Sequence, residues 1–378
     1  MNCIFLVDPQ ARNKGSLAIY DCSLFHNYND NIHYVFYGNS DFGLEDRLNN
    51  LRFIPFFNYH KFNGVKRGLS YVFSMFRFIE EVIKFRPMAI HVEWIRFWPI
   101  DYIVYFICKK ILNVRIIYTV HNILPHNSRG HSDRRKYGKL YALMDGLIVH
   151  TSASKSELIE FFPYIRDDKI FVIPHGILQL DVEEDDVKKA MEAMLIRHEL
   201  SGKTVFAIVG TQSRYKGTDL LLEAWKESPT LSNDNSLCLL VMGKFSKEIN
   251  ASGLPGNVIL DNRLVSDEEF IAAIRIASVV VLPYRRIDQS GVLLTLINEH
   301  TPYCATNVGE LCKPFEIADI GWTIPSSSVQ DIQKKLEYLS MHRQEMKEKR
   351  DNADAWKKVS DFYSWTDISK KTEALYCI

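Results

Sequence analysis

The sequence lacks an excess of charge of either sign. Its 378 residues include 46 lysines and arginines and 46 aspartates and glutamates, so the formal net charge is zero. A general nucleic-acid-binding protein shows a basic excess, so we expect no nucleic-acid partner, although a local basic patch stays open. The composition is otherwise that of a globular protein, with 47% hydrophobic, 24% charged and 12% aromatic residues.

Long apolar runs are missing as well. No uncharged apolar stretch reaches the roughly 18 residues that a membrane-spanning helix needs, and the N-terminus has no basic region and too short an apolar run for a signal peptide. The seven cysteines are scattered and include no Cys-x-x-Cys pair, which excludes a disulfide scaffold and a zinc knuckle. We expect reduced thiols in a cytoplasmic protein, soluble or at most peripheral on the inner face of the plasma membrane.

Spacings of side chains that suit a metal ion are sparse. No convincing Asp-x-Asp pair occurs, and the spacing of His121 and His126 is wrong for a metal pair at a strand end. The acidic run 181–186 could form a metal cluster, but it fits the start of a solvated helix better, because the dipole at a helix N-terminus favours carboxylates. We expect no metal ion and no cofactor.

What the sequence has is an alternation of short β-rich apolar runs and helical patterns, which predicts βαβ units and parallel sheets. The helical segments in the first half include 69–85 and 102–112, and a charged helical segment, 181–199, interrupts the alternation before it restarts. The expected strands are 3–7, 33–37, 89–92, 115–120, 146–150 and 169–173, followed by 204–209, 237–242, 258–260, 279–282 and 302–306.

This pattern predicts two α/β domains, 1–176 and 177–359, joined near Pro174-His175-Gly176, where proline and glycine indicate a linker. At roughly 150 residues per domain, the chain length agrees with two domains. Ligands of open parallel sheets bind beyond the carboxyl ends of the strands. Residues that follow strands are therefore the candidates for a site, and we expect that site in a cleft between the two sheets.

The richest such segment is 210–217, Gly-Thr-Gln-Ser-Arg-Tyr-Lys-Gly, which follows one strand and precedes a helix capped by Thr218. Its glycines permit a sharp turn, and Arg214 and Lys216 place two cations beside a helix N-terminus, which attracts anions. The spacing is not that of a P-loop. A phosphate-bearing ligand fits here, and so does a basic surface turn without function.

A second strand-to-helix segment, 282–294, repeats this chemistry. Ser290 can cap the helix that follows, Gly291 lets a ligand approach the backbone, and Arg285 and Arg286 add charge. By itself this is equally an ordinary capped helix behind a basic loop. Two cation-rich helix starts in one domain favour a diphosphate held between them.

In the first half, His121 and His126 follow a predicted strand, where a lone histidine is more often structural than catalytic. The segment 59–86 interleaves six lysines and arginines with aromatic residues. A basic-aromatic amphipathic helix can lie on an anionic membrane surface. It can equally pack on the sheet, since Phe73, Phe76 and Phe85 also suit a core stripe.

Five stretches together resemble the bacterial glycosyltransferases of family 4 and their relatives with the GT-B fold. They are YTVHNILPH (118–126), VIPHGI (172–177), GTQSRYKG (210–217), LPYRRIDQSGVLL (282–294) and FYSWTDISKKTEALY (362–376), and the segment 261–284 is also similar to the family. The resemblance implies an α/β fold with two Rossmann-like parallel-sheet domains facing a central cleft. It also implies a C-terminal helix, about 360–378, that crosses back to the first domain.

The family's roles carry over to matching positions. The resemblance implies that Lys216, with the displaced Arg214, neutralises the diphosphate of a nucleotide-sugar donor, and that His121 lies near the reacting sugar. Ser290 and Gly291 match the loop whose backbone takes the distal phosphate. The donor-binding prediction as a whole comprises Gly210, Arg214, Lys216, Arg263, Tyr284, Asp288, Gln289, Ser290, Gly291 and Thr295.

Two departures from the family concern this site. The two glutamates that many members carry correspond to Ile287 and Thr295, so contacts to ribose and sugar need other residues, for which Asp288 and Gln289 are candidates. The N-terminal Gly-Gly loop is reduced to 13–16, where Gly15 remains. We assign Gly15 and His126 to acceptor binding.

The sequence therefore predicts a metal-independent glycosyltransferase of the hexosyltransferase type. Its predicted acceptor is a lipid-linked oligosaccharide in bacterial surface polysaccharide synthesis, such as O-antigen of lipopolysaccharide, capsule or exopolysaccharide. The resemblance favours retention of configuration, with His121 at the transferring sugar; an inverting enzyme would need a general base, for which Glu93 is the first candidate.

Three alternatives stay open. A nucleotide-sugar-binding relative with lost or weak activity agrees with the missing glutamates, and a sugar-nucleotide epimerase can use the same fold. A Rossmann oxidoreductase fits least, because the first forty residues contain only Gly15 and Gly38 where a Gly-x-Gly-x-x-Gly motif is needed.

Overall fold

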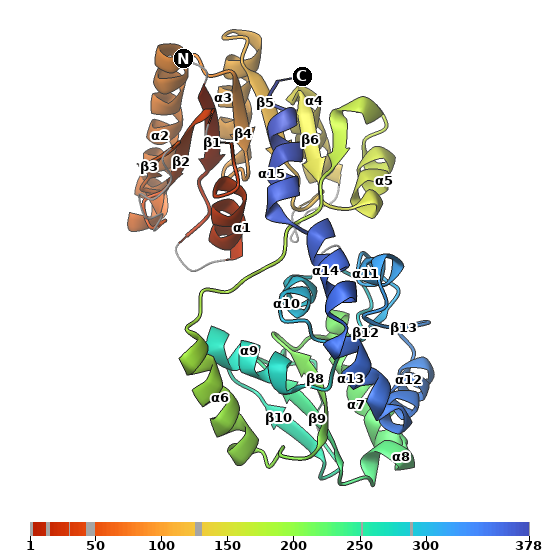
Figure 1. The fold of residues 1–378 in the computed structure, drawn as a ribbon. Helices are drawn as coiled ribbons and strands as arrows, with labels where there is room; N and C mark the ends of the chain where they lie inside the picture. The colour runs from red at the N-terminus through yellow and green to blue at the C-terminus, as the bar shows by residue number, and fades with distance from the viewer. Residues whose placement is uncertain are drawn as a thin grey trace. The chain divides into compact units, whose positions relative to one another are not determined.

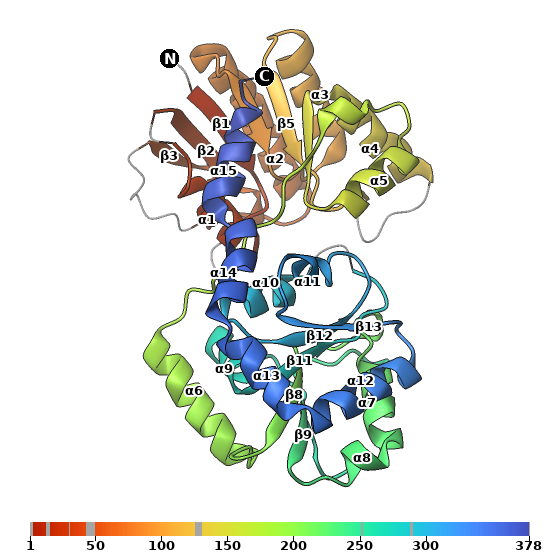
Figure 2. The same ribbon diagram turned by 45° about the vertical axis from the view of Figure 1, so that its right-hand side comes forward.

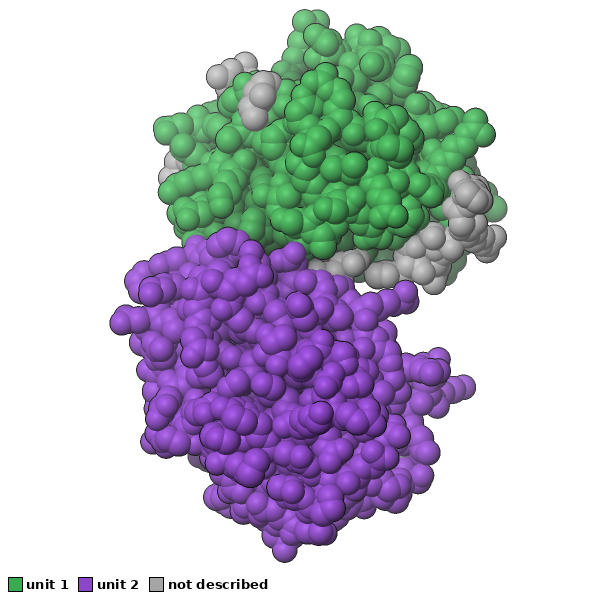
Figure 3. All heavy atoms as spheres, turned by 90° about the vertical axis from the view of Figure 1, so that its right-hand side faces the viewer, with its two compact units in different colours: residues 1–176, 363–378 green, residues 177–362 purple. Residues whose placement is uncertain are grey.

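The computed structural model describes residues 3–12, 16–29, 31–42, 50–124, 131–250, 252–287 and 290–377. The chain forms two compact units, which Figure 3 shows in different colours. Unit 1 comprises residues 1–176 together with 363–378, and unit 2 comprises residues 177–362.

Unit 1 is built on a seven-stranded parallel sheet with the strand order β3-β2-β1-β4-β5-β6-β7 (Figure 1). The order reverses between β1 and β4, so the carboxyl ends of these two strands form the switch point at which open α/β sheets bind ligands. The strands are β1 (Cys3–Asp8), β2 (His33–Asn39), β3 (Leu51–Phe57), β4 (Ala89–Val92), β5 (Arg115–Thr119), β6 (Gly146–Val149) and β7 (Ile170–Val172).

Helices cover both faces of this sheet. One face buries a core with α2 (Gly64–Phe85), α3 (Trp98–Lys110), α4 (His131–Leu143) and α5 (Ser152–Phe161). The other face packs against α1 (Ser16–Phe25) and the C-terminal α15 (Trp365–Ala374), which lie side by side in Figures 1 and 2. Short 3-10 turns, η1 (Tyr59–Lys61) and η2 (Asp167–Lys169), complete the unit.

Unit 2 repeats the plan with a six-stranded parallel sheet in the order β10-β9-β8-β11-β12-β13. Its switch point lies between β8 and β11, which are the two strands that precede the cation-rich segments. The strands are β8 (Thr204–Val209), β9 (Leu237–Met242), β10 (Val258–Asp261), β11 (Val279–Leu282), β12 (Tyr303–Thr306) and β13 (Gly321–Ile324).

The helices of unit 2 surround this sheet. They are α6 (Glu184–Arg197), η3 (Arg214–Lys216), α7 (Thr218–Glu227), α8 (Pro229–Ser232), α9 (Asp267–Ile276), α10 (Gly291–Asn298), α11 (Lys313–Ile317), α12 (Val329–Met341), α13 (Arg343–Asp351) and α14 (Ala353–Phe362). The first turn of α6 contains Glu184, Asp185 and Asp186, which confirms that the acidic run begins a helix.

The structure confirms the alternation and the parallel sheets, and it corrects three expectations. The strands β3 and β13, which lie at edges of the two sheets, were not expected. In β3, Arg52 and Pro55 interrupt the apolar pattern. Thr218 is not the N-cap of α7. Gly217 takes that position in a left-handed conformation, and the Thr218 hydroxyl instead donates to Oε1 of Gln212 at 2.8 Å.

The basic-aromatic segment forms α2, which is longer than the sequence predicts. Tyr71, Met75, Phe78 and Val82 face the core. Phe73 and Phe76 are 65% and 52% exposed, so the alternative that places them in a core stripe is wrong for these two, while Phe85 is partly buried against the core. No helix within the described ranges is both long and apolar enough to cross a bilayer.

Candidate active site

Polar side chains gather at the carboxyl edge of the unit 1 sheet. Asp8 ends β1, Glu93 follows β4, and His121 follows β5, while His150 and His175 follow β6 and β7. Parallel strands bring all these positions to one edge. Asp8 and Glu93 stand at the switch point itself, and both are fully buried.

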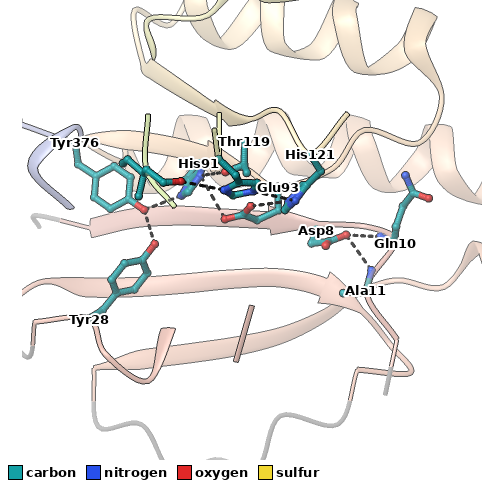
Figure 4. Close-up of polar contacts among 11 residues, drawn as sticks. Asp8, Gln10, Ala11, Tyr28, His91, Glu93, Thr119, His121 and Tyr376 are labelled. Atoms are coloured by element: carbon teal, nitrogen blue, oxygen red, sulfur yellow. Dashed lines mark hydrogen bonds and ion pairs between the residues drawn. The ribbon is translucent and has the colours of Figure 1, made fainter. Parts of the chain in front are cut away.

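The centre of this cluster is the carboxylate of Glu93 (Figure 4). Its Oε2 lies 3.4 Å from Nε2 of His121, and its Oε1 lies 3.3 Å from Nε2 of His91. His91 is held in turn by Thr119 Oγ1 at 2.8 Å and by the hydroxyl of Tyr376 at 2.7 Å. Two strands and the C-terminal segment of unit 1 therefore fix the carboxylate.

Hydrogen bonding defines the tautomers in this cluster. The Nδ1 of His150 lies 3.0 Å from the carbonyl oxygen of Ile173, which can only accept, so Nδ1 carries the proton. Nε2 of His150 then accepts from Nδ1 of His121 at 3.3 Å. A neutral His121 therefore has no proton on Nε2, the atom that faces Glu93.

Burial decides where the remaining proton resides. It lowers the pKa of both His121 and His150 to about 3, so both rings are neutral at physiological pH. It raises the pKa of Glu93, although His91 and Thr119 act in the opposite direction. The proton between Glu93 and His121 is therefore held by the carboxyl group in preference to the imidazole.

Aromatic rings fix the His121 side chain. Trp94 stacks on it with ring centroids 4.9 Å apart and 2° between the planes, and Tyr20 meets it edge-on at 5.0 Å. His121 retains 11% of its side-chain exposure, whereas Glu93 has none. A substrate can thus touch His121 directly, and Glu93 acts through it.

A pair of buried acids, Asp8 and Asp21, lies in the same unit. Asp8 accepts hydrogen bonds from the backbone N–H groups of Gln10 at 2.5 Å and Ala11 at 2.9 Å (Figure 4). Burial raises the pKa of Asp8 to about 7 and also raises that of its neighbour Asp21. Two buried acids this close favour sharing a proton over double ionisation.

In unit 2, glycines bring the candidate donor loops together. Gly217 has φ +70°, and a Cβ there would lie 2.0 Å from the carbonyl oxygen of Pro283, which follows β11. Gly243 has φ +125°, and a Cβ would lie 2.1 Å from the oxygen of Gly210. Only glycine permits both close approaches.

Polar contacts lock these loops. The guanidinium of Arg285 pairs with Asp219 at 2.6 Å and also donates to the carbonyl of Arg214. Buried Gln212 donates to the carbonyls of Gly210 at 2.7 Å and Met242 at 3.0 Å. Arg285 and Gln212 therefore shape the loop, a role that spacing alone did not indicate.

Lys216 is the one of these cations that the fold buries. Its side chain extends toward Gly210, with Nζ 3.4 Å from the Cβ position of that glycine and 5.7 Å from the centre of the Tyr284 ring. It is 8% exposed, and no carboxylate within the described ranges pairs with it. Burial lowers its pKa to about 8.

Beside Lys216, unit 2 has a cavity of about 280 Å³. Gly210, Thr211, Gly291 and Thr295 line one part of it, together with Gly243 and Lys244. Apolar side chains line another part, and Asp267 adds a carboxylate; the apolar residues are Leu178, Leu180, Leu264, Val265 and Phe270.

The remaining predicted donor residues lie outside this lining. Arg214 is exposed, and Arg263 is held by Asp261 at 2.8 Å and Glu269 at 2.7 Å. Ser290 caps α10 by accepting from the N–H of Leu293, as its position predicts, and Tyr284 is buried beside Lys216. The predicted residues Gly15, His126, Asp288 and Gln289 lie outside the described residues.

Several residues of these sites were not singled out from the sequence. His150 and His175 follow strands, so the rule that selected His121 would also have selected them. Asp8, Asp21 and His91 gave no signal, because single polar residues inside apolar runs do not reveal their neighbours. Across the ranges that the structure covers, no three His, Cys, Asp or Glu side chains are grouped as metal ligands would be.

Comparison with known families agrees with this architecture. Residues 30–177 match the family described as Glycosyltransferase Family 4, and residues 192–356 match Glycosyl transferases group 1. Each match falls on one of the two parallel-sheet units. The chain belongs to the family 4-like glycosyltransferases with the GT-B fold.

Solved structures share this fold over the whole chain. HepE from Anabaena, in complex with UDP and glucose, is 15% identical with a TM-score of 0.70, and the match covers 100% of both chains. Sucrose-phosphate synthase from Thermosynechococcus elongatus is 17% identical, with a TM-score of 0.70 over 100% of this chain and 98% of its own.

An α,α-trehalose-phosphate synthase (UDP-forming) from Burkholderia xenovorans, in complex with glucose-6-phosphate, is 11% identical. Its TM-score is 0.63, over 99% of this chain and 100% of its own. No curated protein sequence gives a significant match. At these identities the likeness shows the fold.

Proposed function

We propose that this glycosyltransferase moves a hexosyl group from a nucleoside diphosphate sugar, bound by unit 2, to an acceptor hydroxyl bound by unit 1. The observation that carries the proposal is Lys216, a buried lysine that pairs with no carboxylate of the described residues. An unpaired buried cation is costly and shifts its pKa, which is typical of a functional site. An anion beside Gly210 would compensate that charge, and the diphosphate of a donor fits the position.

The cavity supports a nucleotide in the same place. Its glycines leave the backbone accessible to phosphate oxygens, and its apolar part suits a planar base; Leu264, at 86% exposure, offers an uncovered surface for stacking. Asp267 supplies a carboxylate for ribose hydroxyls, where the family's glutamate is Thr295 here. UDP is the first nucleotide to test, because HepE was solved in complex with it.

The chemical step on the donor side is departure of the diphosphate anion. Lys216 in its charged form and the N-terminus of α10 provide positive potential where negative charge develops, which lowers the barrier without reorganisation. We propose that this stabilisation suffices without a metal ion.

On the acceptor side we propose retention of configuration, with His121 against the transferring sugar. Glu93 fixes the tautomer of His121 and holds the proton between them. The sugar can thus meet a neutral imidazole whose orientation is set by Glu93, Trp94 and Tyr20. Glu93 is a positioning residue in this scheme.

The proposed acceptor is a lipid-linked oligosaccharide of bacterial surface polysaccharide, reached from the inner face of the plasma membrane. Leu69, Phe73 and Phe76 on α2 support this, because they share one helix face and are 63%, 65% and 52% exposed. Lys66, Arg67, Arg77 and Lys84 on the same helix add positive charge. An amphipathic surface of this kind binds anionic membranes.

The test of membrane contact is sedimentation with phosphatidylglycerol vesicles. Replacing Leu69, Phe73 and Phe76 by serine should abolish binding, whereas serine at exposed Ile196 of unit 2 should not. Equal binding by all three proteins would remove the membrane from the account.

The test of the activity is incubation with UDP-sugars and extracted lipid-linked acceptors, with both UDP and glycosylated product measured. Product that depends on acceptor and is lost in Lys216→Ala supports transfer. Nucleotide binding without turnover would indicate a binding relative, and formation of an epimeric sugar nucleotide with no acceptor product would favour an epimerase.

A further inference from the structure

Unit 1 also contains a cavity, which lies at the start of α2 and is not part of the candidate active site. Its volume is about 280 Å³. Tyr59 of η1, the first turn of α2 and the loop between β4 and α3 form its walls, with Gly64, Arg67, Gly68, Arg96 and Phe97 among the lining residues. Three separate segments of the chain thus contribute to one cavity.

The cavity is positively charged. The guanidinium carbons of Arg67 and Arg96 each lie 5.5 Å from the centre of the Tyr59 ring, and Arg12 is close enough to act on the same phenol. No ion pair joins any of these three arginines to a carboxylate of the described residues. Guanidinium groups gathered in this way fit phosphate oxygens.

One acid beside the cavity, Asp101, is already engaged. Asp101 is buried and accepts from the hydroxyl of Tyr71 and from the backbone N–H groups of Arg96 at 2.9 Å and Phe97 at 2.6 Å. Burial raises its pKa to about 7, so it opposes the arginines only weakly. The cavity keeps its positive potential.

The backbone leaves room for a ligand. A Cβ at Gly64 or Gly68 would meet nothing within 4 Å. Asn63 is the N-cap of this 22-residue helix, and its side chain makes no hydrogen bond to the first turn. The backbone N–H groups of that turn therefore stay available for an anion. Open space, arginines and free amides therefore coincide.

We infer that this cavity binds a phosphate or diphosphate group, and that the group belongs to an amphiphilic lipid acceptor. The apolar side chains of Val65, Leu69 and Phe73 continue from the cavity along α2 and are 79%, 63% and 65% exposed, a surface that suits a hydrocarbon chain. The same loop that carries Arg96 carries Glu93 three residues earlier. The assignment of the phosphate group to a lipid acceptor rests on the proposed function, whereas the anion site itself does not.

The test compares charge removal inside and outside the cavity. The double variant Arg67→Gln/Arg96→Gln is measured against Arg86→Gln/Lys110→Gln, which removes the same charge from exposed positions of unit 1 outside the cavity. Each protein is sedimented with vesicles of phosphatidylcholine containing phosphatidic acid or an equal charge of phosphatidylglycerol, with inorganic pyrophosphate as competitor. A Gly68→Leu variant fills the cavity while keeping every charge.

The wild type and the Arg86/Lys110 variant should prefer phosphatidic acid and should be displaced by pyrophosphate. The cavity variants, Gly68→Leu included, should lose that preference by at least about tenfold, because charge-assisted bonds to the phosphate are lost. Direct pyrophosphate binding that needs Arg67 and Arg96, without any lipid preference, would assign the site to a soluble phosphate compound. Equal losses in the two charge variants, or none in Gly68→Leu, would overturn the inference.

UDP affinity is measured on the same proteins. It should be unchanged in every variant, which shows that unit 2 is intact, and an unchanged melting temperature shows that unit 1 is folded. If the wild type binds no UDP, the proposed function fails, while the vesicle and pyrophosphate results still decide the phosphate site.

Discussion

Oε2 of Glu93 lies 3.4 Å from Nε2 of His121, and only the histidine of this pair reaches the surface of unit 1. Burial pushes the pKa values of the two groups in opposite directions, upward for Glu93 and downward for His121. The pair therefore forms a polarised contact in which the carboxyl group holds the proton and only the imidazole is accessible to a ligand.

Replacing Glu93 by glutamine should lower kcat by roughly tenfold or more, since glutamine keeps the shape but cannot exchange the proton. The KM for the donor should stay unchanged, because the donor cavity lies in unit 2. The pH profile of kcat should lose one titration. Glu80→Gln, on the exposed surface of the same unit, is the control. A Glu93→Gln enzyme with normal kcat and a normal pH profile would contradict this role.

Donor affinity should depend on pH through Lys216. Burial lowers its pKa to about 8, so the free protein loses the ammonium charge as pH rises through that value. Between pH 7 and pH 9 the affinity for UDP should fall by about tenfold, which corresponds to one pH unit beyond the pKa. Calorimetric titrations over this range check the prediction, and Lys216→Met should bind weakly with no such slope. A parallel slope in the variant would assign the effect to another group.

Unit 1 should lose stability in mild acid through its buried histidines. The pKa of His150 is about 3 in the folded state and near 6.5 when unfolded, so the unfolded chain binds more protons in this window and stability falls as pH decreases from 6.5 toward 3. From pH 7 to pH 5, one such histidine costs about 2 kcal/mol.

The measurement is the free energy of unfolding of His150→Gln and of the wild type at both pH values. Asp8, whose pKa is raised to about 7, acts in the opposite direction, since its contribution is present at low pH and is lost as pH rises toward 7. The difference between variant and wild type isolates the histidine. His26→Gln, at an exposed site, should follow the wild type; a similar response in both variants would count against the buried cluster.

Gly217→Ala should damage the donor loop. A Cβ there would collide with the oxygen of Pro283, and φ +70° is unfavourable for alanine, so we expect a loss of about 1–3 kcal/mol in stability together with weaker UDP binding. Gly256→Ala, where a Cβ meets nothing within 4 Å, is the matched control. Thermal denaturation with and without UDP checks both effects. Equal melting temperatures for the two variants would show that the two loops do not need this close contact.

Much of this architecture can be predicted from the sequence, because alternating strands and helices form parallel sheets, in which the carboxyl ends of the strands lie at one edge. The chemistry of strand-to-helix turns indicated the donor-site candidates Gly210, Lys216 and Gly291. That Lys216 is buried and pairs with no carboxylate of the described residues could not be predicted, since it depends on how Gly217 and Gly243 draw separate loops together.

The polar cluster around Glu93 was harder to predict from the sequence. Its members come from five strands and from the C-terminal segment, where Tyr376 bonds to His91. No local spacing relates Asp8, Glu93 and His150, and their pKa shifts arise from burial. Likewise the exposure of Phe73 and Phe76 follows from the face that α2 presents to the sheet, which its mixed basic and aromatic pattern leaves open.

The central claim is that unit 2 holds a nucleoside diphosphate through the buried ammonium of Lys216. Isothermal titration of UDP at pH 7 into the wild type, Lys216→Met and Lys334→Met, a lysine exposed on α12, tests it most directly. We predict binding to the wild type and to Lys334→Met with equal affinity, and a loss of at least about tenfold in Lys216→Met. Equal affinity in all three proteins would contradict the account.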